Sequence, residues 1–114
     1  ALWLQGESDS NSPERIAAYQ TGIKQMIGDL RADLGIPKLP FIACTIGELK
    51  AGQEESRGAI NAILLDLPNQ VPHTACVDSR DFSADIGDSV HFDTATQERH
   101  GKLYAKKYGE MLKK

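Results

Sequence analysis

Three short apolar runs alternate with two amphipathic helical patterns, and this alternation constrains the fold more than any other feature. The runs cover residues 1–5, 39–46 and 74–77. Strands that alternate with helices are joined by right-handed crossovers, which make their sheet parallel. The run 39–46 is apolar almost throughout, as is typical of a parallel strand covered on both faces. The order β-α-β-α-β-loop-α therefore predicts an α/β fold with three layers, α/β/α.

The first helical pattern has clear boundaries. Ser12 precedes Pro13, and proline suits the first position of a helix. Apolar residues then recur every three or four positions, which indicates one buried helical face. Gly35 and Pro37 end the pattern.

Two further helices are expected. One spans residues 54–67 and is followed by a turn that begins at Pro68. The last helix starts at Thr94, with Gln97 three positions later as in a capping box. We expect Asp93 to help start this helix.

The chain has 114 residues, the length of one domain or part of one. We predict that residues 1–114 form a single domain. Three strands make a narrow sheet, and the chain begins directly with the apolar residues Ala1, Leu2 and Trp3. We therefore expect the sheet to be incomplete at the N-terminus and this chain to be the C-terminal portion of a longer domain.

The net charge of −3 gives no electrostatic reason to expect nucleic acid or an anionic membrane as a partner. No apolar run approaches the roughly 18 residues of a membrane span. Cys44 and Cys76 each lie in an apolar run, where a buried thiol is the default and a disulfide stays possible. The cellular compartment is left open.

Asp88 and His91 are the clearest candidates for chemistry. They lie three positions apart after a polar stretch, residues 78–90, that is long for a loop. Histidine can move a proton, and a nearby carboxylate can fix its tautomer and stabilise its charged form. By spacing alone, the same pair can instead have a purely structural role in stabilising the loop.

A second group of polar residues follows the first strand and reads Gln5-Gly6-Glu7-Ser8-Asp9. In an open parallel sheet, ligands bind beyond the carboxyl ends of the strands. The loops 5–12, 47–53 and 78–91 all emerge at that edge. We therefore expect the Gln5 group and the Asp88-x-x-His91 group to meet there.

These two groups carry a family resemblance that spans nearly the whole chain. Residues 2–9 resemble the Trp-x-Gln-Gly-Glu-Ser-Asp block of the sialate O-acetylesterase and acetylxylan esterase family, which is carbohydrate esterase family 6. Residues 88–92 resemble the closing Asp-x-x-His block of that family. The family belongs to the SGNH-hydrolase superfamily, so the resemblance implies an SGNH or flavodoxin-like sheet.

The resemblance implies a serine esterase that removes acetyl groups from sugars such as acetylated xylan or sialic acid. His91 would be the general base and Asp88 its orienting carboxylate. Gln5 would contribute its amide to the oxyanion hole, and Gly6 would allow close approach of the backbone to the substrate. No metal or organic cofactor is implied. The nucleophile of the family lies in a Gly-Gln-Ser-Asn type block, which is absent here, so we expect a missing N-terminal segment to carry it.

Several alternatives remain open at this point. Ser8 is the best internal candidate for a nucleophile, although the G-x-S-x-G pattern lacks its second glycine because position 10 is serine. Ser79 and Ser89 have less support. Glu7 and Asp9 are either a second acid–base pair or, as we prefer, carboxylates that support the loop together with Ser8.

Two other functions are compatible with the pattern. The chain can be a non-catalytic sugar-binding or assembly module on the same scaffold, or part of a lipase or thioesterase of the superfamily. Trp3 is expected in the core rather than as a stacking platform for sugar. His73, near a turn, and His100, on an exposed helix, have no partners at metal-ligand spacing, so no zinc site is expected.

Overall fold

The structure, a computed structural model, describes residues 1–47, 54–80 and 91–113. Within these ranges the strands form one parallel sheet in the order β1-β2-β3. The strands are β1 (Leu2–Trp3), β2 (Phe41–Cys44) and β3 (Thr74–Val77); the helices are α1 (Pro13–Leu34), α2 (Glu54–Gln70), α3 (Thr94–Leu112) and the short 3-10 helix η1 (Ser8–Asn11). The predicted alternation of strands and helices is confirmed.

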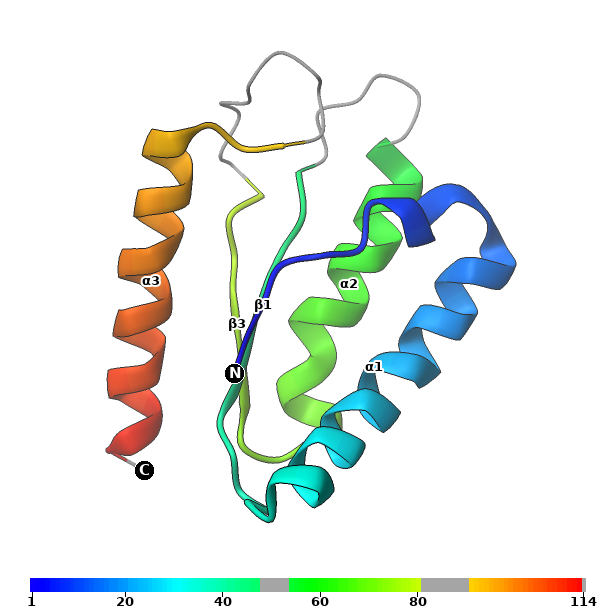
Figure 1. The fold of residues 1–114 in the computed structure, drawn as a ribbon. Coiled ribbons are helices and arrows are strands. Elements are labelled where there is room, and N and C mark those ends of the chain that lie inside the picture. Colours follow the sequence, from blue (N-terminus) through cyan, green and yellow to red (C-terminus); the bar gives the residue numbers. More distant parts are fainter. Residues whose placement is uncertain (48–53, 81–90, 114) are drawn as a thin grey trace.

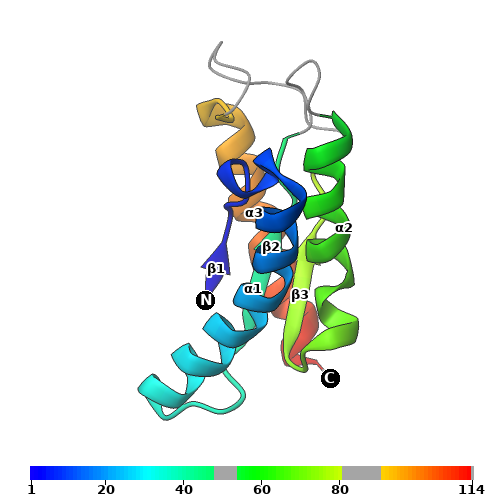
Figure 2. The ribbon, with the colours of Figure 1, turned by 90° about the vertical axis from the view of Figure 1, so that its right-hand side faces the viewer.

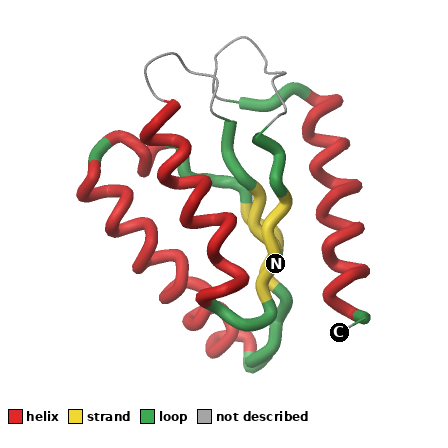
Figure 3. The backbone as a smooth tube through the Cα atoms, turned by 180° about the vertical axis from the view of Figure 1, so that it is seen from behind, coloured by secondary structure: helices red, strands yellow, loops and turns green. Residues whose placement is uncertain are grey.

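Helices cover both faces of the sheet, which confirms the three-layer α/β/α arrangement. Helices α1 and α2 lie on one face and α3 lies on the other (Figure 1). The views from the side and from behind show the same separation (Figures 2 and 3). The core divides accordingly into two clusters. On one face of the sheet the buried residues include Ile27 of α1 and Leu64 of α2. On the other face Ile42 of β2 belongs to the same cluster as Tyr104 of α3. Strand β2 lies in the middle and is buried along its whole length, as its apolar sequence predicts.

Helix α1 begins and ends where the sequence predicts. The Ser12 hydroxyl accepts a hydrogen bond from the backbone N–H of Arg15 at 3.2 Å and so caps the helix before Pro13. At the other end Gly35 adopts a left-handed conformation with φ 67°, which glycine enters without steric cost. The backbone N–H groups of Gly35 and Ile36 then satisfy two of the last helical carbonyls.

Two predicted boundaries are wrong. The second helix continues to Gln70, so Pro68 lies inside its last turn rather than in a turn of its own. Proline there removes only one hydrogen bond, and the helix continues because the N–H of Val71 still bonds to the carbonyl of Leu67 at 2.9 Å. The first strand is shorter than residues 1–5 because pairing with β2 covers only Leu2 and Trp3.

Helix α3 begins at Thr94 and Asp93 helps to start it, as the sequence predicts, but the capping contacts differ. Asp93, not Thr94, is the N-cap, and its carboxylate accepts the N–H of Thr96 at 2.8 Å. Hydrogen bonds from the side chain and the backbone N–H of Thr96 lower the pKa of Asp93. The Gln97 amide donates to the carbonyl of Phe92 at 2.9 Å, so the capping box expected with Thr94 is replaced by a contact two residues further upstream.

The two cysteines are free thiols. They lie on neighbouring strands but contact different sides of the sheet: Cys44 packs in the cluster under α3, and Cys76 packs against the cluster under α1 and α2. Burial raises the pKa of both thiols, that of Cys76 to about 12. Both side chains therefore behave as small apolar residues, as the sequence predicts by default.

Arg31 holds the end of the sheet opposite to the polar loops. This residue of α1 is buried, and its guanidinium donates to the carbonyls of Leu39, Pro72 and His73 at 2.8 to 3.1 Å. It therefore connects α1 to the segments that lead into β2 and β3. Burial lowers the pKa of the Arg31 guanidinium, which stays charged because its ordinary value is far above neutral.

Replacing Arg31 with methionine is expected to lower the free energy of unfolding of the complete gene product by about 3 kcal/mol, because buried carbonyls lose a charged donor. Urea unfolding followed by circular dichroism measures this change. The matched control is Lys38→Met, which removes an exposed cation nearby and should change the free energy of unfolding by less than about 0.5 kcal/mol. Equal effects of the two variants would contradict the role of Arg31.

Candidate functional site

The carboxyl ends of the strands place the loop 4–12 and the segments that follow β2 and β3 at one edge of the sheet (Figure 1). Gln5 follows β1, Thr45 follows β2, and Asp78 follows β3. The segment 91–93 reaches the same edge, because the ring of Phe92 lies against Gly47 just beyond β2. The Gln5 group and His91, the described residue of the second group, are therefore located at a common edge.

The Gln5 side chain makes a defined hydrogen bond within its own loop. Its Nε2 atom donates to Oδ2 of Asp9 at 2.8 Å. Gln5 and Asp9 are both half-buried, and together with Trp3, Tyr19 and neighbouring residues of α1 they line a hollow of about 240 Å³. The Gln5 amide is thus held at a surface opening rather than in the core.

Gly6 turns the chain away from β1. Its φ of 153° lies in a region that residues with a Cβ rarely adopt. A Cβ at this position would approach Cγ2 of Ile60 to 2.7 Å and the Tyr19 hydroxyl to 3.4 Å. Glycine is required here because the turn after Gln5 is packed directly against α1 and α2.

Tyrosine and tryptophan side chains hold the backbone around Gln5. The Tyr19 hydroxyl donates to the carbonyl of Gln5 at 2.7 Å and accepts from Nε1 of Trp3 at 3.0 Å. From the other face of the sheet, the Tyr104 hydroxyl donates to the carbonyl of Trp3 at 2.8 Å. Burial raises the pKa of both tyrosines, that of Tyr19 to about 12. Periodicity places Tyr19 and Tyr104 on buried helix faces, but no sequence signal shows where their hydroxyls bond.

Hydrogen bonds within the loop involve its remaining residues. The Glu7 carboxylate accepts the N–H of Gly6 at 3.1 Å, and the Glu7 carbonyl accepts the hydroxyl of the buried Ser10 at 2.7 Å. Ser8 is exposed at the start of η1, and its carbonyl accepts a weak bond from Arg15 at 3.4 Å. Glu7 and Asp9 thus both accept hydrogen bonds inside the loop.

His91 is exposed, and its neighbours determine its location. The next residue, Phe92, is buried, its carbonyl accepts from the amide of Gln97, and Asp93 caps α3. A solvent-accessible imidazole follows directly after the polar stretch 78–90 and directly before a rigid helix start. Asp88 lies outside the described residues, as does Ser89, so the structure does not place the carboxylate expected to orient His91.

His100 is not on an exposed face of its helix as the sequence suggested. It is 2% exposed, and its ring meets the ring of Phe92 edge to face with the centroids 4.6 Å apart. Burial lowers the pKa of His100. The residue packs beneath the segment that carries His91 and so belongs to its support.

Ser79 also has a structural role. It is fully buried, its N–H donates to the Thr45 hydroxyl at 2.8 Å, and its own hydroxyl lies 3.2 Å from that hydroxyl and 3.2 Å from the Thr45 carbonyl. The pair joins the ends of β2 and β3 at the point where the chain leaves the sheet. A serine inaccessible to solvent cannot attack a substrate, which removes Ser79 as a nucleophile in this arrangement.

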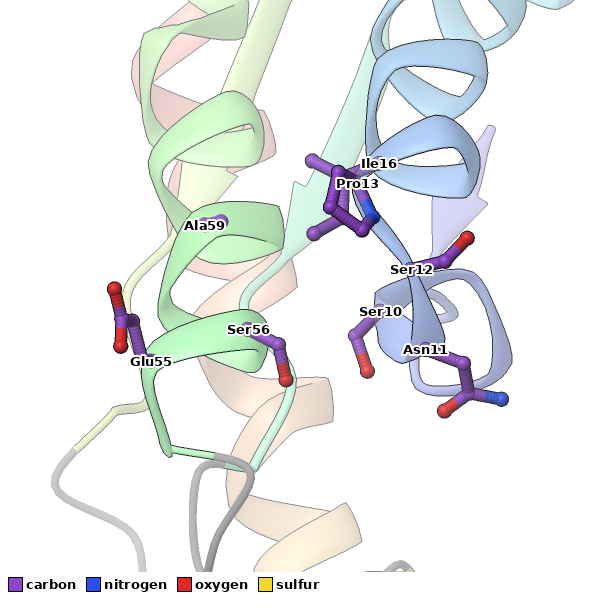
Figure 4. A pocket seen from close by; sticks show the side chains of 8 residues that line it. All are labelled: Ser10, Asn11, Ser12, Pro13, Ile16, Glu55, Ser56 and Ala59. Atoms are coloured by element: carbon purple, nitrogen blue, oxygen red, sulfur yellow. The ribbon is translucent and has the colours of Figure 1, made fainter.

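A larger hollow, of about 510 Å³, lies between the start of α1 and the start of α2 (Figure 4). Hydroxyl and amide groups surround it, and Ile16 and Ala59 supply apolar surface. The residues that line it differ from those that line the hollow beside Gln5. The two openings are therefore distinct, although the loop 5–12 contributes to both.

Within the described ranges, no group of three His, Cys, Asp or Glu side chains could hold a metal ion. In the same ranges, no helix combines the length and the apolar character needed to cross a bilayer. What the edge does provide is an amide with a fixed partner, a tightly packed glycine turn and an exposed imidazole. These are groups suited to stabilising an anion and to moving a proton.

Comparisons with known proteins identify a family and a similar fold. A family model described as carbohydrate esterase, sialic acid-specific acetylesterase, matches residues 1–110. A protein of Arabidopsis thaliana described as a probable carbohydrate esterase is 29% identical over 107 residues, which are 94% of this chain and 38% of the relative. The X-ray structure of an Arabidopsis thaliana protein matches with a TM-score of 0.82 and 28% identity over 96% of this chain and 43% of that chain. The chain spans less than half the length of these relatives.

Proposed function

Because the chain belongs to the carbohydrate esterase family of sialic acid-specific acetylesterases, we propose that it provides the base and an oxyanion donor for removal of acetyl groups from sugars. The observation that carries the proposal is the placement of the Gln5 amide and the His91 segment at one edge of the sheet. The family match covers both residues. The proposed substrate class is an O-acetylated carbohydrate such as acetylated xylan or sialic acid.

The proposed reaction is acyl transfer through a serine that lies outside these 114 residues. His91 takes the proton of the serine hydroxyl while the serine oxygen bonds to the acetyl carbon. The carbonyl oxygen becomes an oxyanion, to which Gln5 donates a hydrogen bond. His91 then gives its proton to the sugar oxygen, the ester bond breaks and the free sugar hydroxyl leaves. Water, activated by His91, releases acetate and restores the serine.

Each remaining residue of the site has a supporting role in this proposal. Asp88 would orient the imidazole of His91 and stabilise its charged form. Gly6 would allow the backbone to approach the substrate closely, and Glu7, Ser8 and Asp9 would support the loop. No metal or organic cofactor takes part in these steps.

The test is hydrolysis of acetylated sugars by the complete gene product. We expect release of acetate from acetylated xylan or O-acetylated sialic acid, and of 4-nitrophenol from 4-nitrophenyl acetate. A serine-directed fluorophosphonate should label the protein once and abolish both activities. Faster hydrolysis of octanoyl than of acetyl esters would indicate a lipase or thioesterase instead. Binding of acetylated sugar without release of acetate would contradict an esterase and support a sugar-binding module.

A further inference from the structure

We propose that Asp9 and Tyr19 are positioning residues that hold Gln5 so that one of its amide N–H groups stays directed to the substrate. The proposal rests on the function proposed above, in which Gln5 stabilises the oxyanion. Asp9 acts on the side chain of Gln5 and Tyr19 acts on its backbone. Neither residue is assigned a contact with the reacting atoms.

The amide of Gln5 has two chemically different ends. Its oxygen end and its nitrogen end have nearly the same shape, so rotation by half a turn exchanges an acceptor for a donor. In an oxyanion hole the wrong end would place a carbonyl oxygen against a negative charge. An enzyme that uses a glutamine amide there needs something that distinguishes the two ends.

Asp9 provides that distinction. A carboxylate only accepts hydrogen bonds, and Oδ2 of Asp9 lies 2.8 Å from Nε2 of Gln5. Rotation of the amide would bring the Gln5 oxygen to the same place, where two acceptors repel each other. The amide nitrogen carries two hydrogens, so one bonds to Asp9 and the second remains available for a substrate oxygen.

Tyr19 determines the position of the backbone from which the Gln5 side chain extends. Its hydroxyl accepts from Nε1 of Trp3 at 3.0 Å, so its own hydrogen is free to go to the carbonyl of Gln5 at 2.7 Å. The raised pKa, about 12, keeps that hydrogen in place near neutral pH. The Tyr104 hydroxyl holds the carbonyl of Trp3 from the opposite face of the sheet. Helices on both sides of the sheet thus locate the end of β1 and the residue Gln5 that follows it.

The dense packing of Gly6 keeps this arrangement rigid. A Cβ at Gly6 would overlap Cγ2 of Ile60 at 2.7 Å and would be in van der Waals contact with Tyr19 at 3.4 Å. Residues of α1 and α2 therefore pack directly against the turn that follows Gln5. Loss of the Tyr19 hydrogen bond should then misdirect Gln5 without releasing the loop.

The experiment compares Asp9→Asn and Tyr19→Phe with Gln5→Ala in the complete gene product, using 4-nitrophenyl acetate as the substrate. We expect both positioning variants to lower kcat about tenfold and to change KM by less than twofold, a part of the loss caused by removing an oxyanion donor outright. Asp29→Asn and Tyr108→Phe, which alter exposed residues of α1 and α3, should keep normal kcat. Thermal unfolding confirms that each variant is folded.

Double variants separate positioning from a general structural effect. Because Asp9 and Tyr19 act through Gln5, adding either change to Gln5→Ala should lower kcat by less than a further twofold. A full tenfold further loss would overturn the proposal, as would normal kcat in Asp9→Asn when Gln5→Ala is slow. If Gln5→Ala itself keeps normal kcat, Gln5 is not the oxyanion donor. The positioning role proposed for Asp9 and Tyr19 is then excluded as well. The failing variant thus identifies which proposal is wrong.

Discussion

Replacing His91 with alanine is expected to lower the kcat of the complete gene product on acetyl esters by about 10²- to 10⁴-fold, the range for loss of a general base. The imidazole takes a proton from the nucleophile in the first half of the proposed reaction and from water in the second half. Since His91 is exposed, the change leaves no cavity in the core, and stability should be nearly unchanged. Initial rates with 4-nitrophenyl acetate and an acetylated sugar measure the effect.

His73→Asn is a matched control for this variant. His73 is also exposed, but it precedes β3 and lies at the opposite end of that strand from the site. Its φ of 58° is one that asparagine adopts readily, so the backbone should not change. A double variant of His91 and the labelled serine should be about as slow as either single variant, because the two groups act as a unit. Near-normal hydrolysis by His91→Ala would remove the assignment of the base.

Replacing Gln5 with alanine should lower kcat by about 10²- to 10³-fold, the effect of removing one oxyanion donor. The donor bonds most strongly to the charge that develops in the transition state, so KM should change much less than kcat. Burst-phase kinetics with 4-nitrophenyl acetate show whether formation of the acyl-enzyme is the slowed step.

Gln25→Ala is the control for the loss of a glutamine amide. Gln25 is exposed on α1, and alanine favours the helix there. An effect of Gln5→Ala that is confined to KM would mean that Gln5 binds the substrate but does not stabilise the oxyanion. A normal kcat and a normal KM would exclude both roles.

Local signals in the sequence predicted most of the fold. The boundaries of α1 follow from Ser12, Pro13 and Gly35, because caps and a proline act on the nearest turn of the backbone. The predicted end of α2 before Pro68 was wrong. Proline near a helix end costs only one hydrogen bond, so α2 continues past it. The length of β1 could not be predicted, since pairing with β2 decides which residues of an apolar run become a strand.

The candidate site was predicted in part. The resemblance of residues 2–9 and 88–92 to a family pointed to Gln5 and His91, and the parallel sheet brings their segments to one edge. The buried state of His100 was not predicted, although His100 precedes Tyr104 by four positions and therefore lies on the same face of α3. The orientation of His91 by Asp88 stays a prediction, since Asp88 lies outside the described residues.

The sequence by itself determined the order of elements, the parallel sheet and the residues with chemical potential, because periodicity, caps and motifs are local properties of the chain. Only the tertiary structure decided what holds those residues. Tyr19 and Tyr104 follow Trp3 by 16 and 101 positions, yet their hydroxyls locate the backbone of residues 3–5 from both faces of the sheet. Hydrogen bonds between residues so distant in sequence depend on how helices pack on the sheet, which no local pattern encodes.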